Sequence, residues 1–269
     1  MFNTGLTRYL PLPVRRLVSD LMWKVADRPR FRPELSVQPS GAVLGCRTAY
    51  NMYGGYCVPL SASYRPAARK VLAGKVWEPD TIEFMIAHAR GGDIVHAGTF
   101  FGDFIPALAR AVGPDHCVWA FEPNPENARC ARMTIALNDL QNVTLTPAGL
   151  GASAATVDME VRDASGRSLG GASHIVEKAD GVTSAKVQIV TVDGAVPHDR
   201  KVGIIQLDVE GFEQQALSGA MDTIRRCKPV IILETLPSRE WLDANILALG
   251  YREAGRLHDN YVLIPPKQL

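Results

Sequence analysis

The sequence lacks a long apolar run. No stretch of the 269 residues approaches the roughly 18 uncharged apolar residues that a membrane-spanning helix needs, which predicts no stable membrane insertion. The N-terminus is also a poor secretion signal, because only a short apolar run follows Arg15 and Arg16, and Asp20 and Lys24 interrupt it.

Paired cysteines and a surplus of one charge are missing as well. The five cysteines are scattered, and no two form a C-x-x-C pair, which argues against a disulfide framework and against a structural zinc site. We therefore expect reduced thiols, a cytoplasmic location and no resident metal. Because 29 Lys and Arg face 28 Asp and Glu, no overall basic field is available, and we expect no nucleic-acid partner.

What is present is the composition of a globular protein, with 46% apolar and 21% charged residues. Pro and Gly punctuate the first 75 residues, where a helix is predicted at about 14–26 and irregular or short-strand structure at 43–60. We expect residues 1–77 to form an N-terminal extension, a substrate cap or an oligomer contact that would make the protein a homo-oligomer. Residues 78–269 are expected to form the main domain.

From residue 78 onward, short apolar strands alternate with helices. The pattern predicts an α/β fold, with a doubly wound, mostly parallel seven-stranded sheet, helices on both faces and an antiparallel C-terminal edge. Asp80 and Glu83 form a D-x-x-E capping signal, and Asn124-Pro125 is typical of a helix start. The predicted strands are 93–97, 117–121, 143–145, 204–207, 230–233, 251–256 and 261–264, with a hairpin at 156–161 and 187–192 and helices at 103–112, 216–224 and 239–248.

Ligands of such sheets bind at the carboxyl ends of the strands, so the residues after each strand are the candidates. Gly98 and Gly102 follow the first strand and allow a tight turn with close ligand approach. Glu122 ends the second strand, where an acid can accept hydrogen bonds from both hydroxyls of a ribose, or can simply favour the next helix N-terminus. Ala148 and Gly149 follow the third strand, and their small size leaves room for a flat base.

Carboxylates follow the fourth and fifth strands. Asp208 and Glu210 point the same way if the chain stays extended, and Glu234 adds a third acid to the rim. These acids could orient a cationic ligand, act as a general base or bind a metal, or they could only cap the next helix.

Several segments together resemble the FkbM-type methyltransferases. The segments are G98-x-x-x-G102-D103, the run FEPNPEN at 121–127, TVD at 191–193, DVEG-x-E at 208–213 and P229-x-x-x-x-E234, in the family's order over about residues 78–240. The resemblance implies a class I enzyme that uses S-adenosyl-L-methionine (SAM), most often for O-methylation of a sugar or natural product. A small-molecule or glycan acceptor is therefore expected.

At the positions that match the family's motifs, the resemblance implies that Gly98 and Gly102 face the methionine part of the cofactor. It further implies that Glu122 holds the ribose beside Asn124 and that Asp208 lies near the sulfonium. The chain departs from the family where His96 replaces the usual Asp and where Thr99-Phe100 replaces Ala-Asn. The expected cofactor-binding residues are His96, Ala97, Gly98, Gly102, Asp103, Glu122, Pro123, Asn124, Ala148, Gly149 and Asp208. The candidate catalytic bases are Asp208, Glu210 and His174, the last in a Gly-rich loop that could cover the pocket.

Two alternatives stay open. A nicotinamide-dependent oxidoreductase shares the strand–turn–helix and the acidic strand end, but it predicts G-x-G-x-x-G where this chain has GTFFG at 98–102. A non-catalytic binding protein that kept the methyltransferase fold would account for His96 and Phe100.

Overall fold

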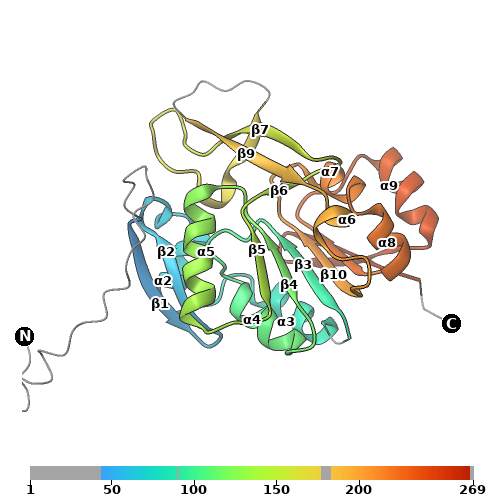
Figure 1. Ribbon diagram of the computed structural model, residues 1–269, viewed down its shortest axis with the longest axis horizontal. Helices are drawn as coiled ribbons and strands as arrows, with labels where there is room; N and C mark the ends of the chain where they lie inside the picture. Colours follow the sequence, from blue (N-terminus) through green and yellow to red (C-terminus); the bar gives the residue numbers. More distant parts are fainter. Residues whose placement is uncertain (1–43, 90, 177–182, 267–269) are drawn as a thin grey trace, which may run out of the picture. The chain divides into compact units, whose positions relative to one another are not determined.

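The computed structural model describes residues 44–89, 91–176 and 183–266 (Figure 1). By its internal contacts the chain divides into residues 1–43 and a compact unit of residues 44–269, and the following concerns the second unit. The helix predicted at 14–26 lies outside the described residues. The proposed boundary at residue 77 stays a prediction.

A seven-stranded sheet forms the centre of this unit and confirms the predicted fold class. Its strands in spatial order are β12 (Arg252–Leu257), β13 (Asn260–Ile264), β11 (Val230–Leu233), β10 (Val202–Leu207), β3 (Asp93–Ala97), β4 (Val118–Phe121) and β5 (Val143–Thr146). The five strands from β11 to β5 pair in parallel, whereas β13 is antiparallel to β11 and β12 to β13. The antiparallel C-terminal edge is thus also confirmed.

The order of the strands places a topological switch between β3 and β10. The chain proceeds from β3 outward through β4 and β5, and then returns to β10 on the other side of β3 and proceeds to β11. Loops that follow β3 and β10 therefore separate in opposite directions, and they leave a crevice at the carboxyl ends of these two strands.

Apolar side chains alternate between the two faces of the sheet, as the two-residue period of a strand requires. Ile94, Ile204 and Ile232 pack in one core with α3 (Pro79–His88) and α4 (Ile105–Val112). On the opposite face, the alternate strand residues pack with α7 (Glu213–Ser218), α8 (Met221–Cys227) and α9 (Arg239–Asn245). Helices α6 (Val192–Ala195) and η4 (Leu247–Leu249) contribute to the same core. By this alternation His96 and Gln206 share the face of Ile94 and Ile204.

Residues 44–77 form a hairpin and a helix beside α5 (Pro125–Leu137). Strands β1 (Cys46–Asn51) and β2 (Gly54–Pro59) pair antiparallel, and η2 (Leu60–Ala62) and α2 (Pro66–Leu72) follow. The Asn138 side chain joins β2 to the end of α5, because its amide oxygen and nitrogen bond the N–H and C=O of Gly55 at 3.0 and 2.6 Å. The segment predicted as irregular or short-strand structure is therefore a regular hairpin.

A second sheet contains the predicted hairpin at 156–161 and 187–192. Its order is β6 (Gly149–Leu150), β9 (Ser184–Val190), β7 (Ala155–Glu160) and β8 (His174–Val176), and β7 and β9 are the antiparallel pair that the alternation predicts. The connection between them was expected to be only a loop, but it contains η3 (Gly170–Ala172) and strand β8. In Figure 1, β7 and β9 lie above the carboxyl end of the central sheet.

Two helix predictions are corrected by tertiary contacts. The stripe at 216–224 divides into α7 and α8 at Gly219, where a Cβ would lie 2.0 Å from the carbonyl oxygen of Gly151. Because the chain passes so close to Gly151 there, one straight helix does not fit. Helix α3 begins at Pro79, so Asp80 lies inside its first turn rather than at the cap. The N-cap is Glu78, in the left-handed conformation (φ 45°).

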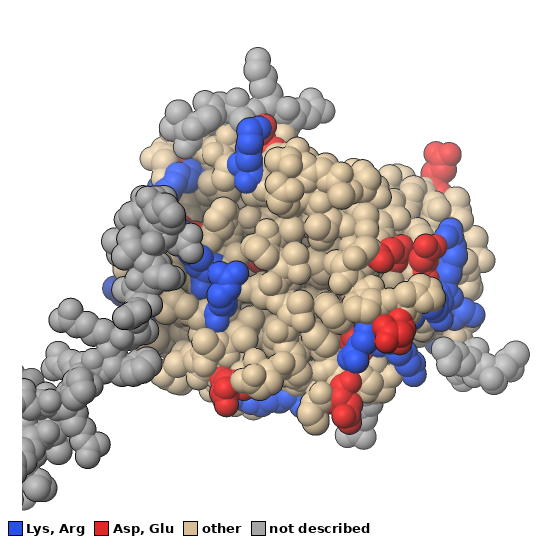
Figure 2. Space-filling view, viewed as in Figure 1, with Lys and Arg blue, Asp and Glu red and all other residues tan. Residues whose placement is uncertain are grey.

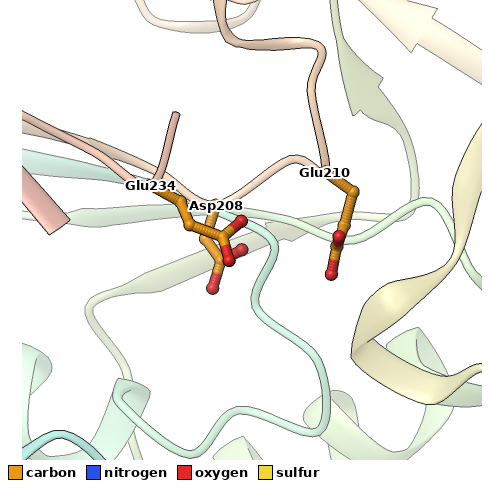
Figure 3. A group of neighbouring side chains, drawn as sticks. All are labelled: Asp208, Glu210 and Glu234. Carbon is orange, nitrogen blue, oxygen red and sulfur yellow. The ribbon is translucent and has the colours of Figure 1, made fainter. Parts of the chain in front are cut away.

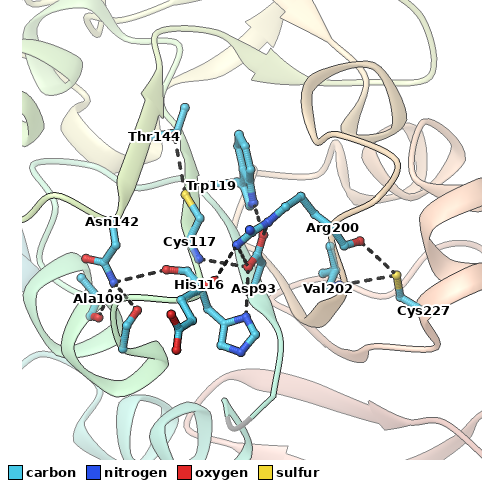
Figure 4. Close-up of polar contacts among 12 residues, drawn as sticks. Asp93, Ala109, His116, Cys117, Trp119, Asn142, Thr144, Arg200, Val202 and Cys227 are labelled. Carbon is cyan, nitrogen blue, oxygen red and sulfur yellow. Dashed lines mark hydrogen bonds and ion pairs between the residues drawn. The ribbon is translucent and has the colours of Figure 1, made fainter.

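A network around the buried Asp93 joins the amino ends of the strands (Figure 4). The carboxylate accepts hydrogen bonds from the Arg200 guanidinium at 2.5 and 2.7 Å, from Trp119 Nε1 at 2.7 Å and from Cys117 N at 3.0 Å. Burial by itself raises the pKa of Asp93, but these donors outweigh it and hold the pKa below its usual value. The network lies at the end of the sheet opposite to the crevice.

The surface carries dispersed charge. Figure 2 shows Lys and Arg and Asp and Glu side chains singly or in small groups on the face in view, separated by uncharged residues. Within the described ranges, no helix has the length and apolar character needed to cross a membrane.

Candidate functional site

Two neighbouring cavities lie at the carboxyl ends of β3, β4, β10 and β11. Both are lined by Gly98, Gly171, Asp208 and Glu210. The first is a narrow cavity of about 40 Å³ with mostly apolar walls, and the second is a polar cavity of about 190 Å³. Gly98, Asp208 and Glu210 come from the two loops that diverge at the topological switch, whereas Gly171 comes from η3 between β7 and β8. The site thus lies where the fold predicts it.

Gly98 brings the two loops into contact. It has φ of +79°, and a Cβ built there would lie 1.8 Å from the carbonyl oxygen of Asp208. Its N–H donates to the carbonyl oxygen of Phe121 at 3.1 Å, which fixes the turn after β3 against the end of β4. Only glycine fits this position without a shift of the backbone.

Glu122, at the end of β4, is buried with 4% of its surface exposed. Its Oε2 accepts from Phe100 N at 2.7 Å, and its Oε1 accepts from Asn124 N at 2.8 Å and from Asn127 Nδ2 at 3.4 Å. Burial raises the pKa of Glu122 to about 8, although these hydrogen bonds oppose the rise. Since a carboxylate offers about four acceptor positions, Glu122 retains capacity for a further donor.

Apolar groups form most of the first cavity around Glu122. The lining residues of this kind are Phe121, Leu150, Met159, Ile175, Val209 and Phe212, and Ala97, Pro123 and Gly149 also line the cavity. At Gly149 a Cβ would come within 2.9 Å of the Ile189 side chain. The cavity is therefore a slot with a single buried acid at one strand end and the loop carboxylates Asp208 and Glu210 also in its lining.

Helix α5 is joined to the segment that covers this slot. Asn124 caps the helix, since its Oδ1 accepts from Glu126 N at 3.0 Å, while its Nδ2 donates to Ser173 Oγ at 3.0 Å. Asn127 Nδ2 also donates to the carbonyl oxygen of Gly170 at 3.1 Å. These two contacts position the Gly170–Ser173 segment over the carboxyl end of β4.

Acidic side chains dominate the second cavity. The six acids that line it are Glu78, Asp103, Asp208, Glu210, Glu234 and Asp259. Burial, with Glu78 nearby, raises the pKa of Asp103 to about 7, and burial with the neighbouring Glu234 raises the pKa of Glu210 to about 7. The pKa of Asp208 is held well above its usual value, first by burial and then by Glu234.

Three of these acids form a compact group, which we call the acidic triad. One carboxylate oxygen each from Asp208, Glu210 and Glu234 lies within 4.8 Å of the other two. Figure 3 shows Asp208 and Glu234 side by side at the ends of adjacent strands, with Glu210 facing them from the loop after β10. Like charges at this separation favour protonation of one member or a bound cation.

Left-handed backbone conformations accompany the second cavity. Three lining residues adopt this conformation: Glu78 (φ 45°), Phe100 (φ 52°) and Glu210 (φ 52°). It is uncommon for residues other than glycine. Each conformation costs on the order of 1–3 kcal/mol, and such strain is concentrated at functional sites. At Glu210 the chain therefore departs from the extended conformation that the sequence suggested.

His96 lies below the acidic triad on the same face of the sheet. Its ring stacks on Phe104, and its Nδ1 donates to Gln206 Oε1 at 2.5 Å. Burial lowers the pKa of His96 to about 4, so the ring is neutral. Its Nε2 is buried and has no hydrogen-bond partner among the described residues.

His174 begins β8 and lines only the first cavity. Its Nε2 lies 3.3 Å from Glu160 Oε2, and 44% of its side chain is exposed. It therefore lies on the side of the slot that the second sheet provides.

The structure brings most of the predicted site residues together. The two cavities are lined by eight of the expected cofactor residues: His96, Ala97, Gly98, Asp103, Glu122, Pro123, Gly149 and Asp208. Gly102, Asn124 and Ala148 line neither cavity. Gly102 (φ +85°) packs on Thr134, and Asn124 acts through helix α5 and Ser173.

Several lining residues were not predicted. Gln206 had a signal, because it interrupts an apolar strand two positions before Asp208 and so shares its face. Arg65, Trp77 and Glu78 had none, since they reach the second cavity through the path of the chain before α3.

Residues 96–255, 160 of the 269, match the methyltransferase FkbM domain. The chain therefore belongs to the FkbM methyltransferase family. No curated protein matches it.

Solved structures with similar folds are methyltransferases of low sequence identity. Methyltransferase FkbM from Methylobacillus flagellatus is 18% identical with a TM-score of 0.43, and the match covers 64% of this chain and 43% of that one. A methyltransferase from Geobacter sulfurreducens is 15% identical (TM-score 0.41; 70% and 79% covered). A SAM-dependent O-methyltransferase from Thermotoga maritima is 17% identical (TM-score 0.37; 71% and 67% covered).

Proposed function

We propose that this chain is a SAM-dependent O-methyltransferase whose acceptor is a hydroxyl group of a sugar or natural product. The observation that carries the proposal is the first cavity of a methyltransferase-family chain, where Glu122, Gly98 and the Asp208 loop converge at the topological switch. The cytoplasmic location, the lack of a nucleic-acid partner and a homo-oligomeric state stay predictions from the sequence.

The residues present fit this cofactor. Gly98 leaves the space that a Cβ would fill beside the Asp208 carbonyl, the walls of the slot suit a flat base, and Glu122 has an acceptor position left for a ribose hydroxyl. The first cavity must widen to admit a nucleoside, because about 40 Å³ holds little more than a water molecule. Widening is consistent with a wall made partly by the separate second sheet.

We assign the roles by position in the two cavities. Ala97, Pro123 and Gly149 would contact the nucleoside by their backbones, Glu122 would accept from the ribose, and His96 and Asp103 would face the amino-acid end. Gly102, Asn124 and Ala148 would act by shaping the loops behind these contacts. Bound SAM supplies a methyl group on a positively charged sulfur, and the carboxylates of Asp208 and Glu210 would attract that charge.

A hydroxyl acceptor gains from a base that removes its proton. Of the three predicted candidates, we favour Glu210, because its pKa of about 7 suits a base at neutral pH and it lines both cavities. Burial and the neighbouring Glu234 raise the pKa of Asp208, so this group tends to hold a proton already rather than to take one from the acceptor. His174 lines the first cavity but not the second, where the acceptor is placed, and it lies beside Glu160.

The second cavity is the proposed place of the amino-acid end of the cofactor and, beside it, of the acceptor. Arg65, Pro66, Ala67 and Trp77 line it, so the segment before α3 supplies part of its wall. This supports a cap role for the described part of the N-terminal extension.

Calorimetry with S-adenosylhomocysteine tests the proposal. We expect binding by the full chain, weakened in Glu122→Ala by about 1–3 kcal/mol, the scale of lost hydrogen bonds to a charged group. Glu122→Gln should lose less, since it keeps one acceptor oxygen. Absence of binding at millimolar ligand would refute the enzyme function, preference for NADH would favour the oxidoreductase, and binding without methyl transfer to any hydroxylated acceptor would favour the non-catalytic alternative.

A further inference from the structure

We propose that the acidic triad is a divalent-cation site. Asp208, Glu210 and Glu234 each present an oxygen within 4.8 Å of the others, a spacing that one ion can bridge. Glu210 has a left-handed backbone, and its side chain descends from the loop after β10 beside the other two (Figure 3). A helix cap does not explain this arrangement, because Asp208 and Glu234 end two neighbouring strands.

His96 is a second, independent observation that points to a ligand. Its side chain is 2% exposed, it lines the same cavity as the triad, and its Nε2 has no partner among the described residues. A carbonyl oxygen only accepts, so Gln206 Oε1 places the ring proton on Nδ1 and leaves the Nε2 lone pair free. This is the tautomer and the supporting hydrogen bond that metal-binding histidines use.

The surrounding charges do not neutralise the triad. Among the described residues lining the cavity, Arg65 is the one Lys or Arg, against six carboxylates. Oxygen donors with one imidazole suit Mg²⁺, Mn²⁺ or a similar ion. A bound dication would supply the missing counter-charge, and a water molecule of its hydration shell would donate to the free lone pair of His96.

The site is a property of the chain without its cofactor. Its link to catalysis rests on the proposed function: an ion in the second cavity would lie where the acceptor is placed and would polarise a hydroxyl oxygen there. Glu210 would then hold the ion in place of acting as the base.

Titration of the full chain with Mn²⁺, followed by the loss of the free-ion EPR signal, tests the site directly. We expect one ion per chain with a dissociation constant below about 1 mM, the weak end of oxygen-ligand sites. Glu210→Gln and Glu234→Gln should each weaken binding about tenfold or more, and His96→Phe, which keeps the stacking on Phe104, should weaken it by a similar factor.

Asp259→Asn is the matched control, since Asp259 lines the same cavity but its side chain is 83% exposed and outside the triad. It should change Mn²⁺ affinity at most about twofold, because exposed charges are screened. Thermal unfolding shows whether each variant is folded. If another variant fails to fold, Glu210→Gln still tests the site, because Glu210 is the exposed member of the triad. Absence of binding, or binding that all the triad variants retain, would overturn the proposal, whereas S-adenosylhomocysteine binding in the same preparation would still support the enzyme function.

Discussion

Buried acids at the two ends of β3 differ in how they are compensated. Asp93, at the amino end, receives a guanidinium, an indole and a backbone N–H, whereas Asp103 and Asp208, beyond the carboxyl end, lie among other acids. Because a buried charge costs free energy unless it is paired, the first arrangement stabilises the fold and the second reduces its stability.

Asp93→Asn should therefore destabilise the protein by about 1.5–3 kcal/mol at neutral pH, the range for hydrogen bonds to a charged group. The folded-state pKa of Asp93 is below its unfolded value, so its contribution is present above the unfolded pKa and is lost as the pH falls through the folded one. Urea unfolding at pH 7 and pH 3 should show the difference between variant and wild type shrinking at pH 3. Asp222→Asn, at a side chain 78% exposed, serves as the control, and an equal loss there would contradict the argument.

Among the elements, α5 has the best-defined start. Asn124 provides the cap oxygen and Pro125 takes the first position, and α5 supports both Glu122 and the Gly170–Ser173 segment.

Asn124→Ala should lower the free energy of unfolding by about 1 kcal/mol through loss of the cap. Asn124→Ser keeps a cap oxygen and loses only the donor to Ser173, so urea unfolding of the two variants separates the two contributions. Equal stability of Asn124→Ala and wild type would show that the cap oxygen contributes nothing here.

Local signals explain why much of the fold was predictable. The strand–helix alternation and the Asn124 cap both act over a few residues, and each is found as predicted. The break at Gly219, the start of α3 and strand β8 depend on distant partners, Gly151, Asn260 and β7 respectively.

The residues of the candidate site also differ in whether local signals or distant partners determine their positions. Residues that directly follow a strand, such as Glu122 and Asp208, could be located because parallel strands end at one edge. Glu78, Arg65 and the free Nε2 of His96 could not, since their places depend on tertiary packing and on the hydrogen bond from His96 to Gln206.

For the whole molecule, the acids around the crevice make stability depend on pH in an unusual direction. The folded-state pKa values are about 7 for Asp103 and Glu210 and about 8 for Glu122, all above their unfolded values near 4. The folded chain thus binds more protons than the unfolded chain across this range. The contribution of these three groups to stability is fully present below their unfolded pKa values and is lost as the pH rises through 7–8.

We expect the thermal unfolding temperature to fall between pH 6 and pH 9. Circular dichroism at several pH values measures it, and Glu122→Gln should flatten the upper part of the curve, because the neutral amide has no proton to lose. A temperature that rises over this interval, or a variant with an unchanged curve, would contradict the assignment of these pKa shifts to the crevice.

The two asparagine contacts from α5 to the Gly170–Ser173 segment have a consequence for sequence divergence. Asn124 donates to a side chain, Ser173, whereas Asn127 donates to a backbone carbonyl that any residue provides. Substitutions at position 173 among related chains should therefore be correlated with substitutions at position 124. Position 170 is restricted to glycine by its own backbone (φ +57°) and by the nearby Ala62 and Phe100, and not by Asn127. The sequences of α5 and of the Gly170–Ser173 segment would in this way change together among related chains.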